Sequence, residues 1–250
     1  MARAIEEVLP EQSILYFGDV ARTPYGSKSP ATITRYAVQN CDFLLANGAK
    51  LIIVACNTAA SVAGHFLQQE YEVPIMEVIT PAVAQAVQAS QSGRIGVIGT
   101  RATINSRIYE EEIQALNPGA RVLSQPCPLL VPLVEEGWLA KRETKMILRR
   151  YLHPLKVKGV DTLVLGCTHY PLLSHLIQPR MGRRVRVIDS SLAVAHELKQ
   201  YLAAHPAVAG QLATGGERRY YVSDITEAAQ KTVGRIFGRK MNLELAQVNK

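Results

Sequence analysis

Short unbroken runs of apolar residues alternate along this chain with segments of helical spacing. The two clearest runs are residues 51–54 and 162–165. A continuous apolar run of this length predicts a strand that is buried on both faces, as in a parallel sheet. Further strands are predicted at residues 13–17, 74–78, 94–100, 121–123, 185–188 and 220–222.

Amphipathic segments between these runs predict helices. Ser29 is a predicted N-cap with Pro30 at the first helical position. Asp189 is a predicted cap for a helix that ends near Ala204. The remaining predicted helices cover residues 2–9, 30–47, 103–116, 141–157 and 226–237, with others starting near 57, 81 and 171. The alternation of strand and helix predicts an α/β fold with mostly parallel sheets.

Both of the clearest predicted strands lead into a cysteine. Cys56 is followed by Asn57-Thr58, and Cys167 is followed by Thr168-His169. Ligands of open parallel sheets bind beyond the carboxyl ends of the strands. A free cysteine is often only a packing residue, but repetition of the pattern favours function. We expect the two thiols to lie on separate sheets that face each other across a cleft.

Composition narrows the class of protein. Of the 250 residues, 48% are hydrophobic and 20% are charged, as in soluble globular proteins. No apolar run has membrane-spanning length, and the first residues carry acids where a signal peptide needs apolar ones. The cytoplasm is therefore the expected compartment. The four cysteines show neither a Cys-x-x-Cys pair nor zinc-ligand spacing, which indicates reduced thiols and no metal site.

The net charge of +7 raises the question of an anionic partner. Lys and Arg are scattered, apart from small clusters at 149–150, 180–186 and 218–219. Aromatic residues make up 6% of the chain, and no nucleic-acid recognition motif is present. This pattern favours a solvated surface or an anionic small substrate over nucleic acid.

Two facing thiols suggest a specific chemistry. A carbon acid held between Cys56 and Cys167 would lose a proton to a thiolate on one face and gain one from a thiol on the other. A free thiol has a pKa of about 8.5, so both forms are accessible near neutrality. Asp19, Glu135 and His169 are candidates to tune the thiols or relay protons. The scheme requires no cofactor, and the G-x-G-x-x-G nucleotide fingerprint is absent.

Four motifs resemble those of glutamate racemases, and they occur in the same order. They are residues 18–26, 55–59, 131–135 and 166–171. The two cysteine motifs alone fit the wider aspartate/glutamate racemase group, whereas Pro24-Tyr25-Gly26 favours glutamate.

The resemblance implies a cofactor-independent, homodimeric enzyme that interconverts L- and D-glutamate and supplies D-glutamate for peptidoglycan. It implies that Cys56 takes the proton from D-glutamate and Cys167 takes it from L-glutamate. Asp19, Glu135 and His169 match supporting acid/base positions. The implied substrate-binding residues are Pro24, Tyr25, Gly26, Asn57, Thr58, Thr100, Thr103 and Thr168. The implied architecture has two pseudo-symmetric α/β lobes, residues 1–80 with 190–250 and residues 81–189.

The sequence departs from the family in one respect. The family begins with a strand and an Asp-Ser-Gly loop that contacts the substrate, whereas this sequence starts in the helix that follows. We expect the sheet of the first lobe to lack a strand, which exposes backbone donors. Either the true start lies upstream or the chain is an impaired relative, and the intact remaining motifs favour an upstream start. Two alternatives to a glutamate racemase stay open, a racemase for aspartate or another small acid and a catalytically impaired relative that binds a partner.

Overall fold

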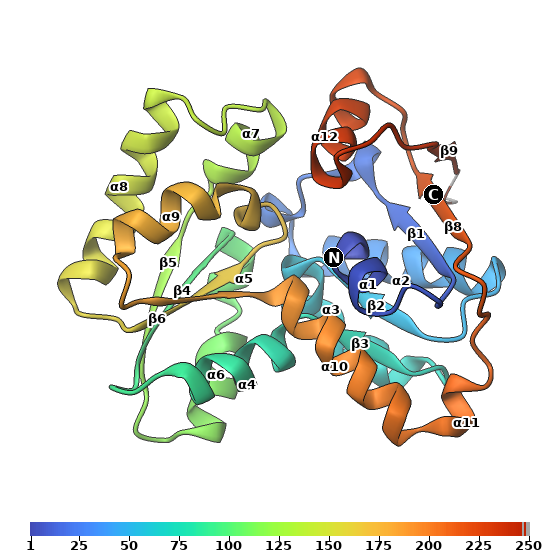
Figure 1. Cartoon of the computed structure of the whole chain (residues 1–250), viewed down its shortest axis with the longest axis horizontal. Coiled ribbons are helices and arrows are strands. Elements are labelled where there is room, and N and C mark those ends of the chain that lie inside the picture. Colours follow the sequence, from blue (N-terminus) through green and yellow to red (C-terminus); the bar gives the residue numbers. More distant parts are fainter. Residues whose placement is uncertain (247, 249–250) are drawn as a thin grey trace.

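The computed structural model describes residues 1–246 and 248, and its strands alternate with helices as the sequence predicts (Figure 1). The strands are β1 (Ile14–Gly18), β2 (Ile52–Val54), β3 (Ile75–Glu77), β4 (Arg94–Gly99), β5 (Arg121–Pro126), β6 (Thr162–Gly166), β7 (Arg186–Asp189), β8 (Arg218–Val222) and β9 (Glu244–Leu245). The longer helices are α2 (Pro30–Ala46), α3 (Asn57–Glu70), α4 (Ile79–Ala89), α8 (Arg142–Val157), α10 (Ser190–Ala204) and α12 (Glu227–Phe237). The shorter ones are α1 (Ala2–Val8), α5 (Arg101–Asn105), α6 (Ile108–Leu116), α7 (Leu130–Glu135), α9 (Ser174–Met181) and α11 (Pro206–Ala209), with 3₁₀ turns η1 (Val20–Arg22), η2 (Tyr25–Ser27) and η3 (Tyr170–Leu173).

The strands form three sheets in which every paired neighbour is parallel. One sheet has the order β5-β4-β6-β7, the second β1-β8-β9, and the third pairs β2 with β3. The strands before the two thiols, β2 and β6, lie in different sheets, and the predicted α/β fold is confirmed. Within the described residues no ladder joins β1 to β2. The division into lobes at residues 80 and 190 stays a prediction.

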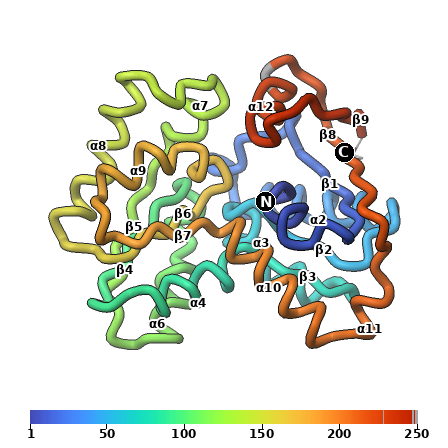
Figure 2. Tube along the Cα trace, viewed as in Figure 1, coloured from blue at the N-terminus to red at the C-terminus, as the bar shows by residue number. Residues whose placement is uncertain are grey.

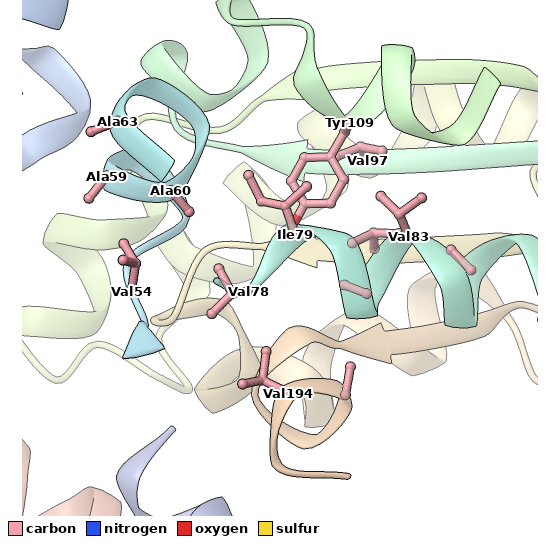
Figure 3. Close-up of a cluster of buried hydrophobic side chains, with 14 of the residues drawn as sticks. Val54, Ala59, Ala60, Ala63, Val78, Ile79, Val83, Val97, Tyr109 and Val194 are labelled. Atoms are coloured by element: carbon pink, nitrogen blue, oxygen red, sulfur yellow. The ribbon is translucent and has the colours of Figure 1, made fainter. Parts of the chain in front are cut away.

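One apolar core joins the β2-β3 sheet to the β5-β4-β6-β7 sheet. Helices α3, α4 and α10 contribute small and β-branched side chains, and Figure 3 shows Ala60, Ile79 and Val194 among them. Val83 and Val97 are fully buried in the same cluster. Helix α4 packs on α10 and on β6, and α10 also contacts β3, so these helices connect the two sheets. This packing fixes the end of β2, before Cys56, relative to the end of β6, before Cys167.

The N-terminal helix α1 packs against α10. Ala4 and Ile5 of α1 pack against Ala195, Leu198 and Leu202 of α10. The N-terminal end of the chain lies beside α10 in Figure 2. No helix in the described part of the chain has both the length and the apolar character that crossing a bilayer requires.

Side-chain caps mark the starts of some of the helices. The Ser29 side chain accepts a hydrogen bond from the Thr32 N–H, and the Asp189 side chain accepts one from the Ser191 N–H, so both predicted caps are confirmed. The prediction of one helix over residues 103–116 is wrong. Arg107 adopts a left-handed conformation with a φ of 61°, which ends α5 and starts α6 in a new direction. The short elements α11 and β9 were not predicted.

Candidate active site

Cys56 lies at the end of β2 and occupies the N-cap position of α3. Burial raises the pKa of the Cys56 thiol, and the nearby Cys167 raises it further. The backbone N–H groups of Ala59 and Thr58 and the Thr58 hydroxyl lower the pKa, because they favour the thiolate. Cys167 therefore lies near enough to Cys56 to affect its pKa, although the two residues follow strands of different sheets.

Cys167 follows β6 and belongs to a line of three polar groups. Its Sγ lies 3.8 Å from Nδ1 of His169, and Nε2 of His169 lies 3.3 Å from Oε1 of Glu135 at the end of α7. Burial alone would lower the pKa of His169, but its hydrogen bonds to Cys167 and Glu135 outweigh burial and raise the pKa to about 10. The imidazole is thus held as a cation beside the thiol through the neutral pH range.

Close backbone packing fixes the position of Cys167. A Cβ atom on Gly166 would lie 2.8 Å from the backbone oxygen of Ile98 on β4. Only glycine permits that approach of the two strands just before the thiol. Thr168 follows Cys167 directly and is half-buried.

Three threonine hydroxyls form a buried cluster that links α3 to the start of α5. Oγ1 of Thr58 lies 2.9 Å from Oγ1 of Thr100 and 3.3 Å from Oγ1 of Thr103. Oγ1 of Thr100 and Oγ1 of Thr103 are 3.0 Å apart, and the Thr100 side chain also caps α5. The fold thus brings Thr58 to Thr100 and Thr103, which lie more than 40 residues later in the sequence, and all three are predicted substrate-binding residues.

Asn57 is buried beside Cys56 and is only partly satisfied. Its Oδ1 accepts a 2.6 Å hydrogen bond from the Tyr109 hydroxyl, which fixes the orientation of the amide. Its Nδ2 is buried without a hydrogen-bond partner in the described residues. An unsatisfied buried donor costs about 1–3 kcal/mol, so this amide is suited to an acceptor on a bound ligand.

Asp19 and Tyr25 belong to a separate network at the loop after β1. The Asp19 carboxylate accepts hydrogen bonds from the Tyr25 hydroxyl, from Nε of Arg22 at 2.7 Å and from the Ser223 hydroxyl at 2.9 Å. Nδ2 of Asn40 donates to the Tyr25 hydroxyl at 3.1 Å. Burial, followed by the hydrogen bond to Asp19, raises the pKa of Tyr25. Asp19 therefore fixes the loop through hydrogen bonds to Arg22, Tyr25 and Ser223. Within the described residues, none of its hydrogen bonds goes to a thiol.

The loop that contains Pro24 and Gly26 touches the threonine cluster. Pro24 is exposed, whereas Gly26 packs so closely on Thr100 that an added Cβ atom would lie 2.7 Å from Cβ of Thr100. The loop after β1 thus rests directly on the N-cap of α5.

We predict that Gly26→Ala lowers the free energy of unfolding by about 1–3 kcal/mol, because the added methyl group overpacks against Thr100. Denaturant unfolding followed by fluorescence measures this. The matched control is Gly64→Ala in α3, where the new Cβ would lie at an ordinary 3.7 Å from Cγ of Glu77. That change removes a glycine from a helix interior and is expected to leave stability equal or higher. Equal stability of the two variants would contradict the prediction.

Several residues of this region were not singled out from the sequence. They are Tyr109, Asn40 and Ser223. Ser223 had a usable signal, because it directly follows strand β8, whereas Tyr109 is one aromatic residue inside a helix and carries none. No group of three or more His, Cys, Asp or Glu side chains suited to a metal ion occurs in residues 1–246 and 248.

Comparison with known proteins identifies the family. The pattern of the Asp/Glu/Hydantoin racemase family matches residues 1–198. The chain belongs to this family. Among curated relatives, the glutamate racemase of Geobacter metallireducens is 41% identical, with 96% of this chain and 88% of that protein covered. The glutamate racemase of Neisseria gonorrhoeae is 44% identical over the same shares.

Solved structures of racemases have the same fold. Glutamate racemase isoform RacE1 from Bacillus anthracis superposes with a TM-score of 0.93 at 32% identity, covering 99% of this chain and 92% of that one. Glutamate racemase from Francisella tularensis, solved in complex with D-glutamate, gives 0.90 at 34% identity and the same coverage. The resemblance to glutamate racemases and the assignment of the chain to the racemases, a class of isomerase, are confirmed.

Proposed function

We propose that this chain interconverts L- and D-glutamate by proton transfer through two thiols. The observation that carries the proposal is the pair Cys56 and Cys167, which follow strands of different sheets although Cys167 lies near enough to raise the pKa of Cys56. Such coupling requires that the thiols lie close together. A small substrate between them would meet a sulfur atom on each face of its α-carbon.

The proposed reaction moves one proton at each sulfur. For L-glutamate, the Cys167 thiolate removes the α-proton and the Cys56 thiol donates its proton to the opposite face. The carbon is inverted, Cys167 becomes the thiol and Cys56 becomes the thiolate. For D-glutamate the same steps run in reverse. Every group in this scheme is a side chain of the protein, so no cofactor is needed.

The surroundings of the two thiols differ, and each suits its proposed role. The His169 cation lies beside Cys167, is paired with the Glu135 carboxylate and can exchange a proton with Cys167. Cys56 depends instead on N–H groups of the first turn of α3 and on the Thr58 hydroxyl. We assign His169 and Glu135 supporting acid/base roles and Asp19 the role of holding the Tyr25 loop.

The substrate's charged groups have matching partners. The unpaired Nδ2 of Asn57 suits a carboxylate oxygen, and the hydroxyls of Thr58, Thr100 and Thr103 can turn to donate to another. We assign Tyr25, Gly26, Pro24 and Thr168 to the walls of the same site. Relatives named glutamate racemase at 41–44% identity support glutamate as the substrate, whereas an aspartate racemase structure from Picrophilus torridus is 20% identical and shares the fold alone.

We further propose that the enzyme acts as a homodimer in the cytoplasm and supplies D-glutamate for peptidoglycan. The family resemblance supports each of these points. The four cysteines are free, as expected for a reducing compartment.

The deciding experiment offers L-glutamate, D-glutamate and L-aspartate in D₂O and follows the α-proton by NMR and the optical rotation in parallel. We expect both glutamate enantiomers to exchange their α-proton and to reach equal concentrations at equilibrium. The kcat/KM for aspartate should be much lower. A folded protein that exchanges no glutamate proton would refute the proposal. A higher kcat/KM for aspartate would replace glutamate by the smaller acid as the substrate.

A further inference from the structure

The positive charge of this chain is concentrated in one segment. Residues 141–186 contain eleven of the 28 Lys and Arg residues but two of the 21 Asp and Glu residues. The local net charge is therefore +9, whereas the whole chain carries +7. The excess charge of the protein thus belongs to α8, α9 and the turn before β7.

A stripe of exposed cations runs along α8. Arg142, Lys145, Arg149 and Lys156 are exposed, and the exposed His153 completes their spacing of three and four residues. Such spacing places the side chains on one helix face over about 21 Å. The adjoining face of the helix is apolar and buried, through Leu148, Leu152 and Leu155. The stripe is therefore fixed toward solvent.

The second cluster lies next to this stripe. Arg180 of α9 donates to the backbone oxygen of Lys145 at 3.0 Å, and the two helices pack side by side (Figure 1). The turn that follows α9 carries exposed Arg183 and Arg184, and exposed Arg186 is the first residue of β7. A surface hollow of about 260 Å³ is lined by two of these arginines with Gln178, Val185 and Val187. Clusters that are separate in the sequence thus form one cationic face, which we call the α8–α9 face.

These charges are not neutralised within the protein. None of the eleven Lys and Arg side chains forms an ion pair in the described residues. Seven of them are arginines, whose planar guanidinium groups pair well with phosphate oxygens. The face is therefore available to an external polyanion.

We propose that the α8–α9 face binds the phosphate backbone of duplex nucleic acid without sequence preference. Such binding needs closely spaced cations and little else. A protein partner would need buried aromatic or apolar anchors, and the large apolar side chains exposed on α8 are Met146 and Val157, with no aromatic among them. A membrane would need a helix with its apolar face free, but that face of α8 is buried. Single strands bind through aromatic stacking platforms, which the exposed part of α8 lacks.

Fluorescence anisotropy with a labelled 20-base-pair DNA duplex tests this binding. We expect micromolar affinity at low salt and a plot of log K against log salt with a slope of about −4 to −5, as five phosphate contacts would give. The variant R149E/K156E reverses two charges of the stripe and is expected to bind at least about tenfold more weakly. The control K50E/K199E makes the same change in net charge at exposed positions on other elements and should bind nearly as the parent does. Thermal unfolding of each variant shows that it is folded.

Three results would overturn the proposal. The first is equal weakening of the two variants, which would indicate net charge alone. The second is tighter binding at the same salt to vesicles that contain phosphatidylserine. The third is tighter binding to poly-glutamate, which would indicate an acidic protein partner. None of these results depends on racemase activity, so they leave the proposed function untouched.

Discussion

Replacing Cys167 with serine is expected to abolish racemisation while leaving slow α-proton exchange of one enantiomer. A serine hydroxyl keeps its proton near neutral pH and therefore cannot act as the base. L-Glutamate then lacks the group that removes its α-proton. Loss of a positioned acid/base group lowers kcat by about 10²–10⁴-fold. D-Glutamate still meets Cys56, which can remove its proton and return a deuteron to the same face. NMR in D₂O therefore sees exchange of D-glutamate without inversion.

The mirror variant makes this prediction sharper. Cys56→Ser should lose exchange of D-glutamate and keep slow exchange of L-glutamate. The control is Cys41→Ser, a change at a cysteine that is buried in α2 and packs in the core, and its activity per folded molecule should equal that of the parent. Racemisation by either active-site variant at more than about a tenth of the parent rate would contradict a two-thiol mechanism. Loss of the same enantiomer in both variants would contradict the assigned faces.

The elements that carry the site could be predicted because their signals are local. The apolar run before Cys56 and the run before Cys167 each fix a buried strand, and parallel pairing then puts both thiols at carboxyl ends of strands. Capping residues such as Ser29 and Asp189 fixed two helix starts. These features depend on a few neighbouring residues, which a sequence displays directly.

The partners of the site residues could not be predicted, because they depend on contacts across the fold. Thr58 and Thr100 meet only when α3 and β4 are packed through the shared core. Tyr109 reaches Asn57 because the chain turns at Arg107, which sequence periodicity did not reveal. The cationic face was hidden for the same reason, since α8 and α9 are adjacent in space and 16 residues apart in the chain.

The pH dependence of the enzyme should be set by the Glu135–His169 pair. His169 has its pKa raised to about 10, so the imidazole is protonated below that pH and loses its proton above it. In the parent, the alkaline fall of kcat/KM is therefore expected near pH 10. Glu135→Gln removes the negative charge that accepts a hydrogen bond from His169. The pKa of His169 is therefore expected to fall, and the alkaline limb of the kcat/KM profile to move to lower pH.

The matched control for this change is Glu136→Gln, which alters the neighbouring exposed acid and leaves the bond to His169 intact. Its pH profile should coincide with that of the parent. Profiles of kcat/KM between pH 6 and 11, together with NMR titration of the His169 ring, measure both variants. The two observables must move together, because the profile of the free enzyme reports the same proton that the ring signal reports. A shifted ring pKa with an unshifted profile would separate His169 from catalysis and leave Cys167 to work without it.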